Sequence, residues 1–418
     1  MHTKLLLVLA ALCTFVVLPI HAQTLTVIHA FTGANDGAFP YSGMTWDGDG
    51  NLYGTTTSGG KKGCNSDLGC GTVFRVSRSG LTWVLTTIYR FQGKADGWNP
   101  FARVVFGPDG SLYGTTQNGG NQARGTFGFG TVFRLTPPRP GCQAQCEWTH
   151  TVLYRFTGGS DGANPGVGDL IFDGDGNIYG TTESGGLVER SCVIAAPGCG
   201  VVFELSPAKC GWTEHVLYSF TGGQDGDLPI GGVIFDPKGN LLGTTSEGGA
   251  SSYGTVFQLI LSGATWQEKT LHAFSGYRDG AFPAASLFLD RDAQAVYGTT
   301  SGSLDGGGTV FQLSPSAKGY AFETDYLFPF PDDPSSAITQ SKGNLYGTTP
   351  NGGNGWGTVF EMVSNSGVWT VTTLYTFQSH DDGSTPEGNI LVDSSGNIYG
   401  TTSLAGAYYD GVIYEITP

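Results

Sequence analysis

Residues 231–274, GGVIFDPKGNLLGTTSEGGASSYGTVFQLILSGATWQEKTLHAF, contain four short apolar segments separated by turn-forming residues. The segments cover residues 231–236, 241–245, 254–259 and 266–274, and they are rich in Val, Ile, Phe and Thr. None is long enough, or periodic enough at 3.6 residues, to form a helix, so each predicts a β-strand. The link that starts at Asp236, Asp-Pro-Lys-Gly, is typical of a hairpin turn. This stretch therefore predicts a unit of four antiparallel strands.

The same unit recurs seven times along the chain. The second segment contains the motif Tyr-Gly-Thr-Thr, which starts at Tyr53, Tyr113, Tyr179, Tyr297, Tyr346 and Tyr399, with Leu242-Gly-Thr-Thr as a variant. The third segment contains Gly-Thr-Val-Phe or a close relative, which starts at Gly71, Gly130, Gly200, Gly254, Gly308, Gly357 and Gly411. Repeats of four strands indicate the blades of a propeller, in which face-to-face packing buries both sides of the middle strands. Recurring phenylalanines, such as Phe74 and Phe133, are expected in the core between blades. The sequence thus predicts an all-β, seven-bladed β-propeller with four antiparallel strands per blade.

The two ends of the chain fix the phase of the repeat. Leu25 to Phe31 matches a fourth segment, whereas Gly411 to Ile416 matches a third. We therefore expect the N-terminal strand to close the last blade, which leaves no open seam in the ring. Pro329 falls within a fourth segment in this alignment, and a strand proline is tolerated mainly at a sheet edge, so the fourth strand should be outermost.

The first residues predict export from the cytoplasm. Lys4, the apolar run from Leu5 to Ile20, and His21-Ala22 have the pattern of a secretory signal peptide, which gives a signal peptide over residues 1–22 and a propeller over residues 23–418. No later stretch has the roughly 18 consecutive apolar residues of a membrane helix. We expect a secreted or periplasmic protein that is soluble, unanchored and monomeric.

The composition excludes some partners. The formal net charge is −15, and loss of Lys4 with the signal peptide makes it more negative. A surface of this charge repels nucleic acid and anionic membranes, so we expect neither as a partner. With 68 glycines and 12% aromatic residues, the chain is far from the composition of disordered proteins.

The repeat resembles that of the GloVer tandem-repeat proteins, a bacterial family of secreted proteins. Its features are Gly-Asn-Leu-Tyr-Gly-Thr-Thr, a Gly-rich link and Gly-Thr-Val-Phe, and residues 51–56, 177–182, 344–349 and 397–402 match the first part well. This resemblance covers nearly all of the chain after the signal peptide, and it implies secretion but no reaction and no catalytic residues. In its Asp-x-x-Gly-Asn turns the chain is also similar, more loosely, to NHL-type propellers, which mostly bind partners.

An Asp-Gly pair occurs in almost every link from a fourth segment to the next repeat. The recurring carboxylates are Asp36, Asp96, Asp161, Asp225 and Asp279, with Asp382 in the last such link. One interpretation is a ring of carboxylates at the mouth of the central channel that holds a cation or sugar hydroxyls. The other is that each Asp caps its own turn while Gly takes a positive φ. Because a binding site usually breaks the symmetry of its scaffold, we favour the turn.

The Asp-Gly-Asp-Gly runs at Asp47 and Asp173 are similar to the start of a calcium loop. The bidentate Glu at the twelfth loop position is missing, since Ser58 and Ser184 stand there. Hairpin turns explain the runs better, and we expect no cofactor, with calcium as the alternative.

Departures from the repeat are the better guide to a ligand site. The inserts between the second and third strands are longest in the first three copies, and a propeller should place them on the same face as the Asp-Gly links. Candidate ligand-binding residues in these inserts are Arg124, Phe127, Phe129, Glu189 and Arg190. A further candidate pair on this face is His380 with Asp382.

Seven cysteines remain beyond the signal peptide, an odd number for an oxidising compartment. Cys64 with Cys70, and Cys192 with Cys199, each fall within one insert and predict short disulfides. Cys142, Cys146 and Cys210 leave one thiol over. The simplest pairing is Cys142 with Cys146, although Cys210 could pair across blades. Their spacing does not predict a zinc site.

The sequence favours a non-catalytic binding module that recognises an extracellular polysaccharide or protein through the face with the long inserts. No nucleophile elbow, metalloprotease helix or phosphate loop is present in the sequence, so no catalytic residue is assigned. The alternatives are a propeller lyase, lactonase or glycosidase with carboxylates at the channel mouth, and a structural component of the cell envelope.

Overall fold

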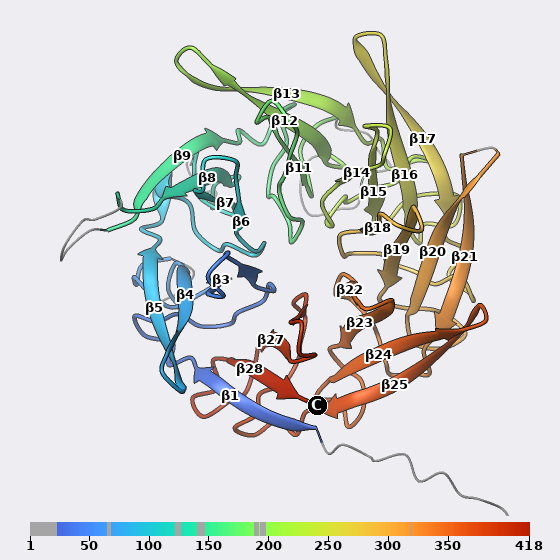
Figure 1. Cartoon of the computed structure of the whole chain (residues 1–418). Coiled ribbons are helices and arrows are strands. Elements are labelled where there is room, and N and C mark those ends of the chain that lie inside the picture. The colour runs from blue at the N-terminus through green and yellow to red at the C-terminus, as the bar shows by residue number, and fades with distance from the viewer. Residues whose placement is uncertain are drawn as a thin grey trace, which may run out of the picture.

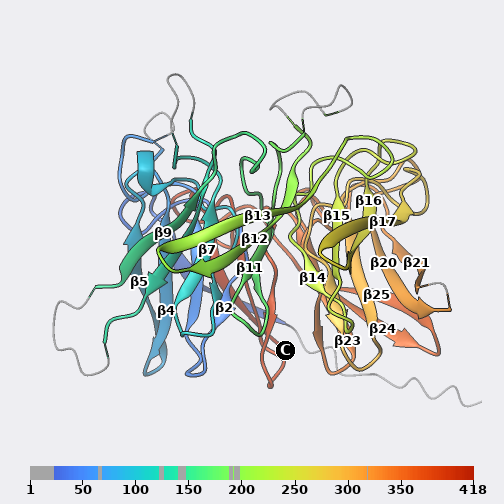
Figure 2. The same ribbon diagram turned by 90° about the horizontal axis from the view of Figure 1, so that it is seen from above.

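The computed structural model describes residues 23–64, 68–121, 127–139, 147–187, 192, 198–317 and 319–418. These residues form seven four-stranded antiparallel sheets arranged as the blades of a ring (Figure 1). Seen from the side, the strands run between the two faces of the ring (Figure 2). The predicted seven-bladed β-propeller is confirmed. Within the described part of the chain, no helix is long and apolar enough to cross a membrane.

Each blade runs from an inner strand near the axis to an outer strand at the rim. The inner strands are β2 (Thr45–Trp46), β6 (Val105–Phe106), β10 (Ile171–Phe172), β14 (Ile234–Phe235), β18 (Phe288–Asp290), β22 (Thr339–Ser341) and β26 (Leu391–Val392). The second strands are β3 (Leu52–Thr56), β7 (Leu112–Thr116), β11 (Ile178–Thr182), β15 (Leu241–Thr245), β19 (Ala295–Thr300), β23 (Asn344–Thr349) and β27 (Ile398–Thr402). The third strands are β4 (Thr72–Ser79), β8 (Thr131–Thr136), β12 (Val201–Ala208), β16 (Thr255–Ser262), β20 (Thr309–Ser316), β24 (Thr358–Asn365) and β28 (Val412–Thr417). The outer strands are β5 (Thr82–Arg90), β9 (Thr149–Arg155), β13 (Gly211–Ser219), β17 (Thr265–Ala273), β21 (Gly319–Leu327), β25 (Val368–Thr376) and β1 (Thr24–Ala30).

The last blade is closed by the N-terminal strand. Its strand order is β1-β28-β27-β26, so β1 is the outer strand beside the last strand of the chain. Both the predicted phase and the outermost place of the fourth segment are confirmed. The predicted place of Pro329 within a fourth strand is wrong, because β21 ends at Leu327 and Pro329 lies in the link that follows.

An aromatic pair joins every blade to the next. The last residue of each fourth segment packs on the third strand of the neighbouring blade in the pairs Phe31–Phe74, Phe91–Phe133, Phe156–Phe203, Phe220–Phe257, Phe274–Phe311, Phe328–Phe360 and Phe377–Tyr414, with ring centroids 5.0 to 5.4 Å apart. All of these rings are buried, as expected for the core. Such pairs add to the stability that their buried area provides. The same two positions of the repeat therefore form the ring pair at every blade interface.

The same rings explain the glycine of Tyr-Gly-Thr-Thr. A Cβ atom on Gly54 would lie 2.5 Å from Cζ of Phe74, and one on Gly180 would lie 2.7 Å from Cζ of Phe203. Only a residue without a side chain fits beneath the phenylalanine. The two halves of the repeat motif are therefore in direct contact within one blade.

Two kinds of link emerge on one face of the ring. These are the second-to-third strand links and the links from each outer strand to the next blade. Isolated β-bridges join them, as between Ala38 and Ser58 and between Trp98 and Asn118. We call this the insert face, and the opposite side, where the tight hairpin turns lie, the hairpin face.

Candidate functional site

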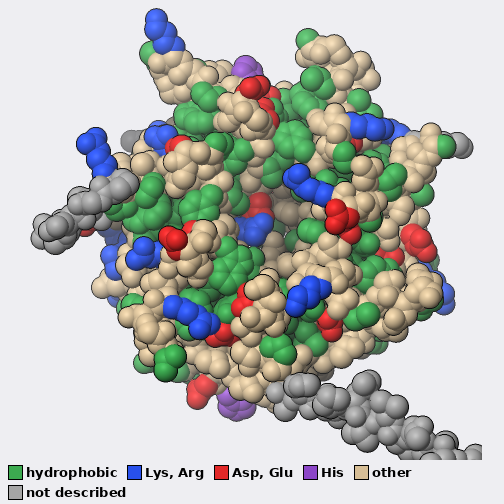
Figure 3. Space-filling model, viewed as in Figure 1, with side chains coloured by type: hydrophobic (Ala, Val, Ile, Leu, Met, Phe, Trp, Pro, Cys, Tyr) green, Lys and Arg blue, Asp and Glu red, His purple; other side chains and the backbone are tan. Residues whose placement is uncertain are grey.

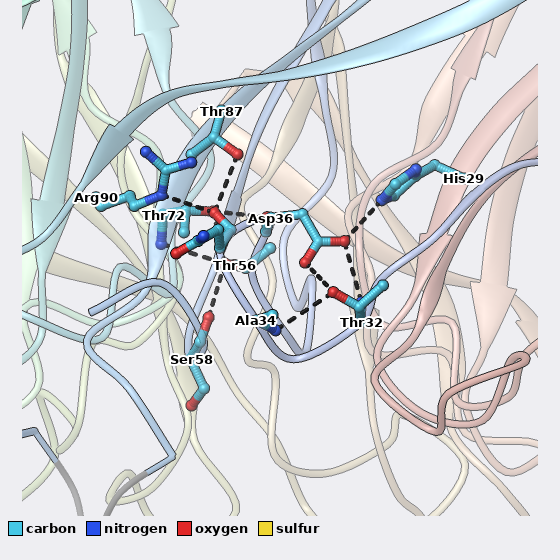
Figure 4. A network of polar contacts seen from close by, with 10 residues as sticks. His29, Thr32, Ala34, Asp36, Thr56, Ser58, Thr72, Thr87 and Arg90 are labelled. Atoms are coloured by element: carbon cyan, nitrogen blue, oxygen red, sulfur yellow. Dashed lines mark hydrogen bonds and ion pairs between the residues drawn. The ribbon is translucent and has the colours of Figure 1, made fainter. Parts of the chain in front are cut away.

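The recurring Asp residues on the insert face are engaged in their own turns. Asp36 accepts hydrogen bonds from the backbone N–H and hydroxyl of Thr32, and its Oδ2 lies 3.0 Å from Nε2 of His29 on β1 (Figure 4). Burial tends to raise the pKa of Asp36, but these hydrogen bonds outweigh it and hold the pKa below its ordinary value. The carboxylate therefore fixes the turn that it sits in.

The other members of the series repeat this arrangement. Each accepts from a backbone N–H four residues earlier and contacts a Tyr or His of the outer strand: Asp96, Asp161, Asp225, Asp279 and Asp382. None of them lines the central cavity described below. The structure thus places these carboxylates at the turns and not around the axis.

The Asp-Gly-Asp-Gly runs form hairpin turns. Oδ1 of Asp47 accepts the backbone N–H groups of Asp49 and Asn51, and its Oδ2 accepts the Asn51 amide and the Tyr53 hydroxyl. Asp173 makes the same four bonds. Both carboxylates are saturated by their own hairpins. Among the described residues, no group of three or more His, Cys, Asp or Glu side chains could hold a metal ion.

Both predicted insert disulfides are present. Cys64 is bonded to Cys70, and Cys192 to Cys199. Cys210 carries a free, exposed thiol. Cys142 and Cys146 lie outside the described residues, so their predicted pairing stays a prediction.

Two of the candidate ligand residues of the inserts, Phe127 and Phe129, lie in the described part of the chain. The Phe127 ring is 71% exposed and packs edge-on against Trp98, whereas Phe129 is half-buried and its ring covers Gly158. Arg124, Glu189 and Arg190 lie outside the described residues.

The predicted pair in the sixth blade is a turn like the others. His380 is exposed, and its Nδ1 donates to the carbonyl oxygen of Gln378 at 2.7 Å. Asp382 accepts the backbone N–H groups of Gln378 and His380 and the hydroxyl of Tyr375. Neither His380 nor Asp382 lines the central cavity.

A cavity of about 310 Å³ lies on the axis of the ring. Its wall comes from the segments that lead into the inner strands. Just before each inner strand stands a buried apolar residue: Met44, Val104, Leu170, Val233, Leu287, Ile338 and Ile390. The residues that precede these form the waist ring: Gly43, Arg103, Asp169, Gly232, Ser286, Ala337 and Asn389. The residues two positions earlier form the upper ring: Tyr41, Phe101, Val167, Ile230, Ala284, Ser335 and Glu387.

Both rings break the symmetry of the repeat. All members of the waist ring except Gly232, and all members of the upper ring except Phe101, line the cavity. No two blades share a residue type in the upper ring, although a proline and a buried apolar residue flank this segment in every blade. The scaffold is therefore periodic while the cavity wall is not, which is typical of a binding site.

The waist ring carries an ion pair. Nε of Arg103 lies 2.7 Å from Oδ2 of Asp169, and both side chains are largely buried. Burial raises the pKa of Asp169, and Arg103 opposes that shift. Because the two charges offset each other, the pair presents polar groups without a net charge.

Above the waist, Glu387 is the exceptional side chain. Burial raises its pKa to about 7, with a hydrogen bond from Tyr41 lowering the value and the charge of Asp333 raising it. Its Oε2 is buried and has no hydrogen-bond partner among the described residues. A buried carboxyl oxygen without a partner is costly, and protonation of the carboxyl lowers this cost, in keeping with the raised pKa.

A second cavity of about 300 Å³ continues beyond the waist. Arg103, Asp169, Ser286, Ala337 and Asn389 line both cavities, so the waist separates them. Viewed from the side on which the C-terminus lies, the molecule is hollowed at its centre, with basic and acidic side chains inside the hollow (Figure 3). Ser301, in a second-to-third strand link, lines the first cavity, which places that cavity on the insert face.

Exposed aromatic side chains of the described residues occur only on the insert face. They are Phe127, Tyr277, Phe282, Phe330, Trp356, Tyr408 and Tyr409, all in links of that face. The exposed large apolar residues of the strands and the hairpin face are Val and Leu, for example Leu81 and Val368. Six of the seven aromatics lie on blades five to seven and the link leading into them, away from the long inserts of blades one to three.

The cavity wall was not predicted from the sequence, although a signal for it is present there. Aligning the seven copies on the proline of each link shows the unmatched residues between that proline and the inner strand. This segment is shorter than the inserts of blades one to three, but its residues differ more from blade to blade than the rest of the repeat does.

Known structures share the fold. A putative 6-phosphogluconolactonase from Bacteroides uniformis is 16% identical, with a TM-score of 0.52 over 86% of this chain and 89% of that one. The periplasmic gluconolactonase of Pseudomonas aeruginosa is 14% identical, with a TM-score of 0.50 over 86% and 96%. At such identities the likeness establishes the propeller fold alone.

The sequence itself was compared with curated proteins and with family models. No curated protein matches the chain significantly. The model of the Gloeobacter/Verrucomicrobia repeat matches residues 14–194, 194–353 and 296–418, which together span nearly the whole chain. The chain therefore belongs to the family of the Gloeobacter/Verrucomicrobia repeat, as the Tyr-Gly-Thr-Thr and Gly-Thr-Val-Phe motifs indicated.

Proposed function

We propose that this protein is a non-catalytic extracellular module that binds a neutral polysaccharide through its insert face. The observation that carries the proposal is the restriction of exposed aromatic side chains to that face. Exposed aromatic rings in one region mark an interaction site, since a solvated surface has no need of them. Tyr and Trp combine a flat apolar face with a polar group, which suits the C–H faces and hydroxyls of sugars.

The charge of the protein supports a neutral ligand. Its formal net charge of −15 disfavours acidic polysaccharides, nucleic acid and anionic membranes. The insert face also offers many backbone and hydroxyl groups in its Gly-rich links, which can hydrogen-bond to sugars. We extend the ligand surface from the long inserts, including Phe127, to the aromatic residues of blades five to seven.

Two disulfides support a place outside the cytoplasm. Both crosslink insert-face links, and such bonds persist in the periplasm or outside the cell. Together with the expected signal peptide over residues 1–22, they fit a secreted or periplasmic protein.

The proposal is tested with immobilised neutral polysaccharides, namely cellulose, xylan, mannan and β-1,3-glucan, and with the acidic polymer alginate. We expect binding to at least one neutral polymer, and loss of most of that binding in the variant Trp356→Ala/Tyr408→Ala. The matched control, Leu81→Ala/Val368→Ala, removes exposed apolar side chains away from the insert face and should bind normally. Binding of alginate alone, or equal loss in both variants, would contradict the proposal.

Glu387 favours a propeller hydrolase or lyase as the second candidate. A carboxyl with a pKa of about 7 in a cavity is suited to general acid catalysis at neutral pH. Release of new reducing ends from the bound polysaccharide, abolished by Glu387→Gln, would establish this alternative in place of a binding module.

A further inference from the structure

The first cavity lies on the insert-face side of the waist ring, and it shares residues of that ring with the second cavity. Residues from all seven blades line it, and the Arg103–Asp169 pair is among them. Its 310 Å³ lies at the lower end of the range of small-molecule sites, about 300–1,000 Å³. A space of this size suits a single small ring, such as the last residue of a chain that enters from the insert face.

The wall of the cavity has an apolar and a polar side. Val167, Ile230 and Ala284, from three consecutive blades, provide the apolar side. Ser335, Glu387 and Tyr41, from the following three, provide hydroxyl and carboxyl groups. A pyranose ring has the same division, with C–H groups on its faces and hydroxyls around its edge.

The hydrogen-bonding groups favour an uncharged ligand. Arg103 is already paired with Asp169, so no unpaired cation awaits a carboxylate or phosphate. The hydroxyls of Tyr41 and Ser335 and the carboxyl of Glu387 belong to residues of the cavity wall. Such groups exchange hydrogen bonds with sugar hydroxyls, whereas a ligand carboxylate would be repelled by the ionised form of Glu387.

We propose that this cavity binds the terminal ring of a neutral polysaccharide, so that the protein recognises chain ends. This inference rests on the proposed function and adds a specific site to it. The aromatic side chains of the insert face then contact the residues of the polymer that follow the terminal ring.

The first test measures binding of free monosaccharides by calorimetry and by competition with the immobilised polysaccharide. The probes are glucose, galactose, mannose, xylose and arabinose, with glucuronic acid as the acidic comparison. At least one neutral sugar should bind saturably and compete with the polymer, and glucuronic acid should not. If the polymer binds and no monosaccharide competes, recognition of chain ends is overturned while the proposed function stands. If a monosaccharide binds and no polymer does, the proposed function fails and the cavity site stands.

The second test locates the site. Ala284→Trp fills the apolar side of the cavity and should abolish monosaccharide binding. The matched control is Ala250→Trp, which adds the same side chain at an exposed position of the insert face outside the cavity wall. Equal loss in both variants would contradict the assignment to the cavity.

A variant without a volume change guards against misfolding. Glu387→Gln keeps the shape of the wall and replaces the carboxyl with an amide, which changes the hydrogen-bonding groups, so it should weaken monosaccharide binding roughly tenfold. Unchanged affinity in a folded Glu387→Gln protein would overturn the proposed role of this carboxyl.

Discussion

Leu25 lies opposite Ile416 in the antiparallel pair that joins β1 to β28. This pairing is the closure of the ring, because β1 is the outer strand of a blade whose other three strands come from the end of the chain. Deleting residues 23–31 would leave β28 as an unpaired edge and would remove Phe31, which is fully buried against Phe74. We predict a large drop in the thermal midpoint, measured by circular dichroism.

A milder change tests the same closure. Phe31→Ala should cost about 3–5 kcal/mol, the range for truncating a buried phenylalanine. Val27→Ala, in the same strand but 36% exposed, should cost much less. A truncated protein that melts like the full chain would show that β1 does not close the ring.

Gly168 lies in close backbone contact with the next blade, so a side chain at this position should destabilise the fold. A Cβ atom on Gly168 would lie 2.0 Å from the backbone nitrogen of Gly232 in the next blade. Gly168→Ala should therefore destabilise the fold by about 2–3 kcal/mol, as overpacking does. Gly174→Ala, in a hairpin turn where a Cβ meets nothing within 4 Å, serves as the control and should be nearly neutral in urea unfolding.

The ion pair at the waist predicts a pH-dependent defect. Arg103→Met leaves the Asp169 carboxyl buried without its partner and should cost about 3 kcal/mol near pH 7.5. Without Arg103 the folded-state pKa of Asp169 rises further above its unfolded value, so protonation relieves the cost as the pH falls. The difference between variant and wild type in urea unfolding should shrink at pH 4.5. A difference that is the same at both pH values would contradict this account.

Two outer strands, β13 and β17, carry half-buried glutamates. Burial raises the pKa of Glu214 and of Glu268 to about 7, and the charges of Asp161 and Asp225 act in the same direction. Because the folded state holds these protons more tightly than the unfolded state, stability should fall as the pH rises from about 4.5 to 7.

Thermal melts across this range test the effect. The wild-type midpoint should fall between pH 5 and pH 8, and the variant Glu214→Gln/Glu268→Gln should lose less stability over the same range. Glu147→Gln, at an exposed position, is the matched control and should follow the wild type. A double variant with the wild-type pH dependence would refute the contribution of these two carboxyls.

The fold was predictable because repetition multiplies a weak local signal. One set of four short segments is ambiguous alone, but seven sets with the same turns leave a propeller as the consistent solution. The phase followed from the chain ends, since residues 25–31 and 411–416 supply the parts that complete one blade. Pro329 was misassigned to the fourth strand of its blade, which ends two residues earlier, at Leu327.

The candidate site was much less predictable. Single residues from distant repeats, such as Arg103, Asp169 and Glu387, meet only when the ring closes on its axis. The sequence pattern also does not indicate which carboxylates face the cavity. Asp36 and its equivalents are hydrogen-bonded within their own turns, whereas Glu387 lines the cavity and its Oε2 has no partner among the described residues. The exposed aromatics of blades five to seven lie in short links that resemble ordinary turns.

Hydrogen–deuterium exchange tests the central claim most directly, because it locates a ligand on the ring without altering the protein. The protein is measured with and without the neutral polysaccharide that it binds best. The account predicts protection in the insert-face links, residues 275–283, 351–357 and 404–410, and in the channel segment 335–337. Protection confined to the hairpin face, at residues 47–51 and 173–177, or to the outer strands, would contradict it.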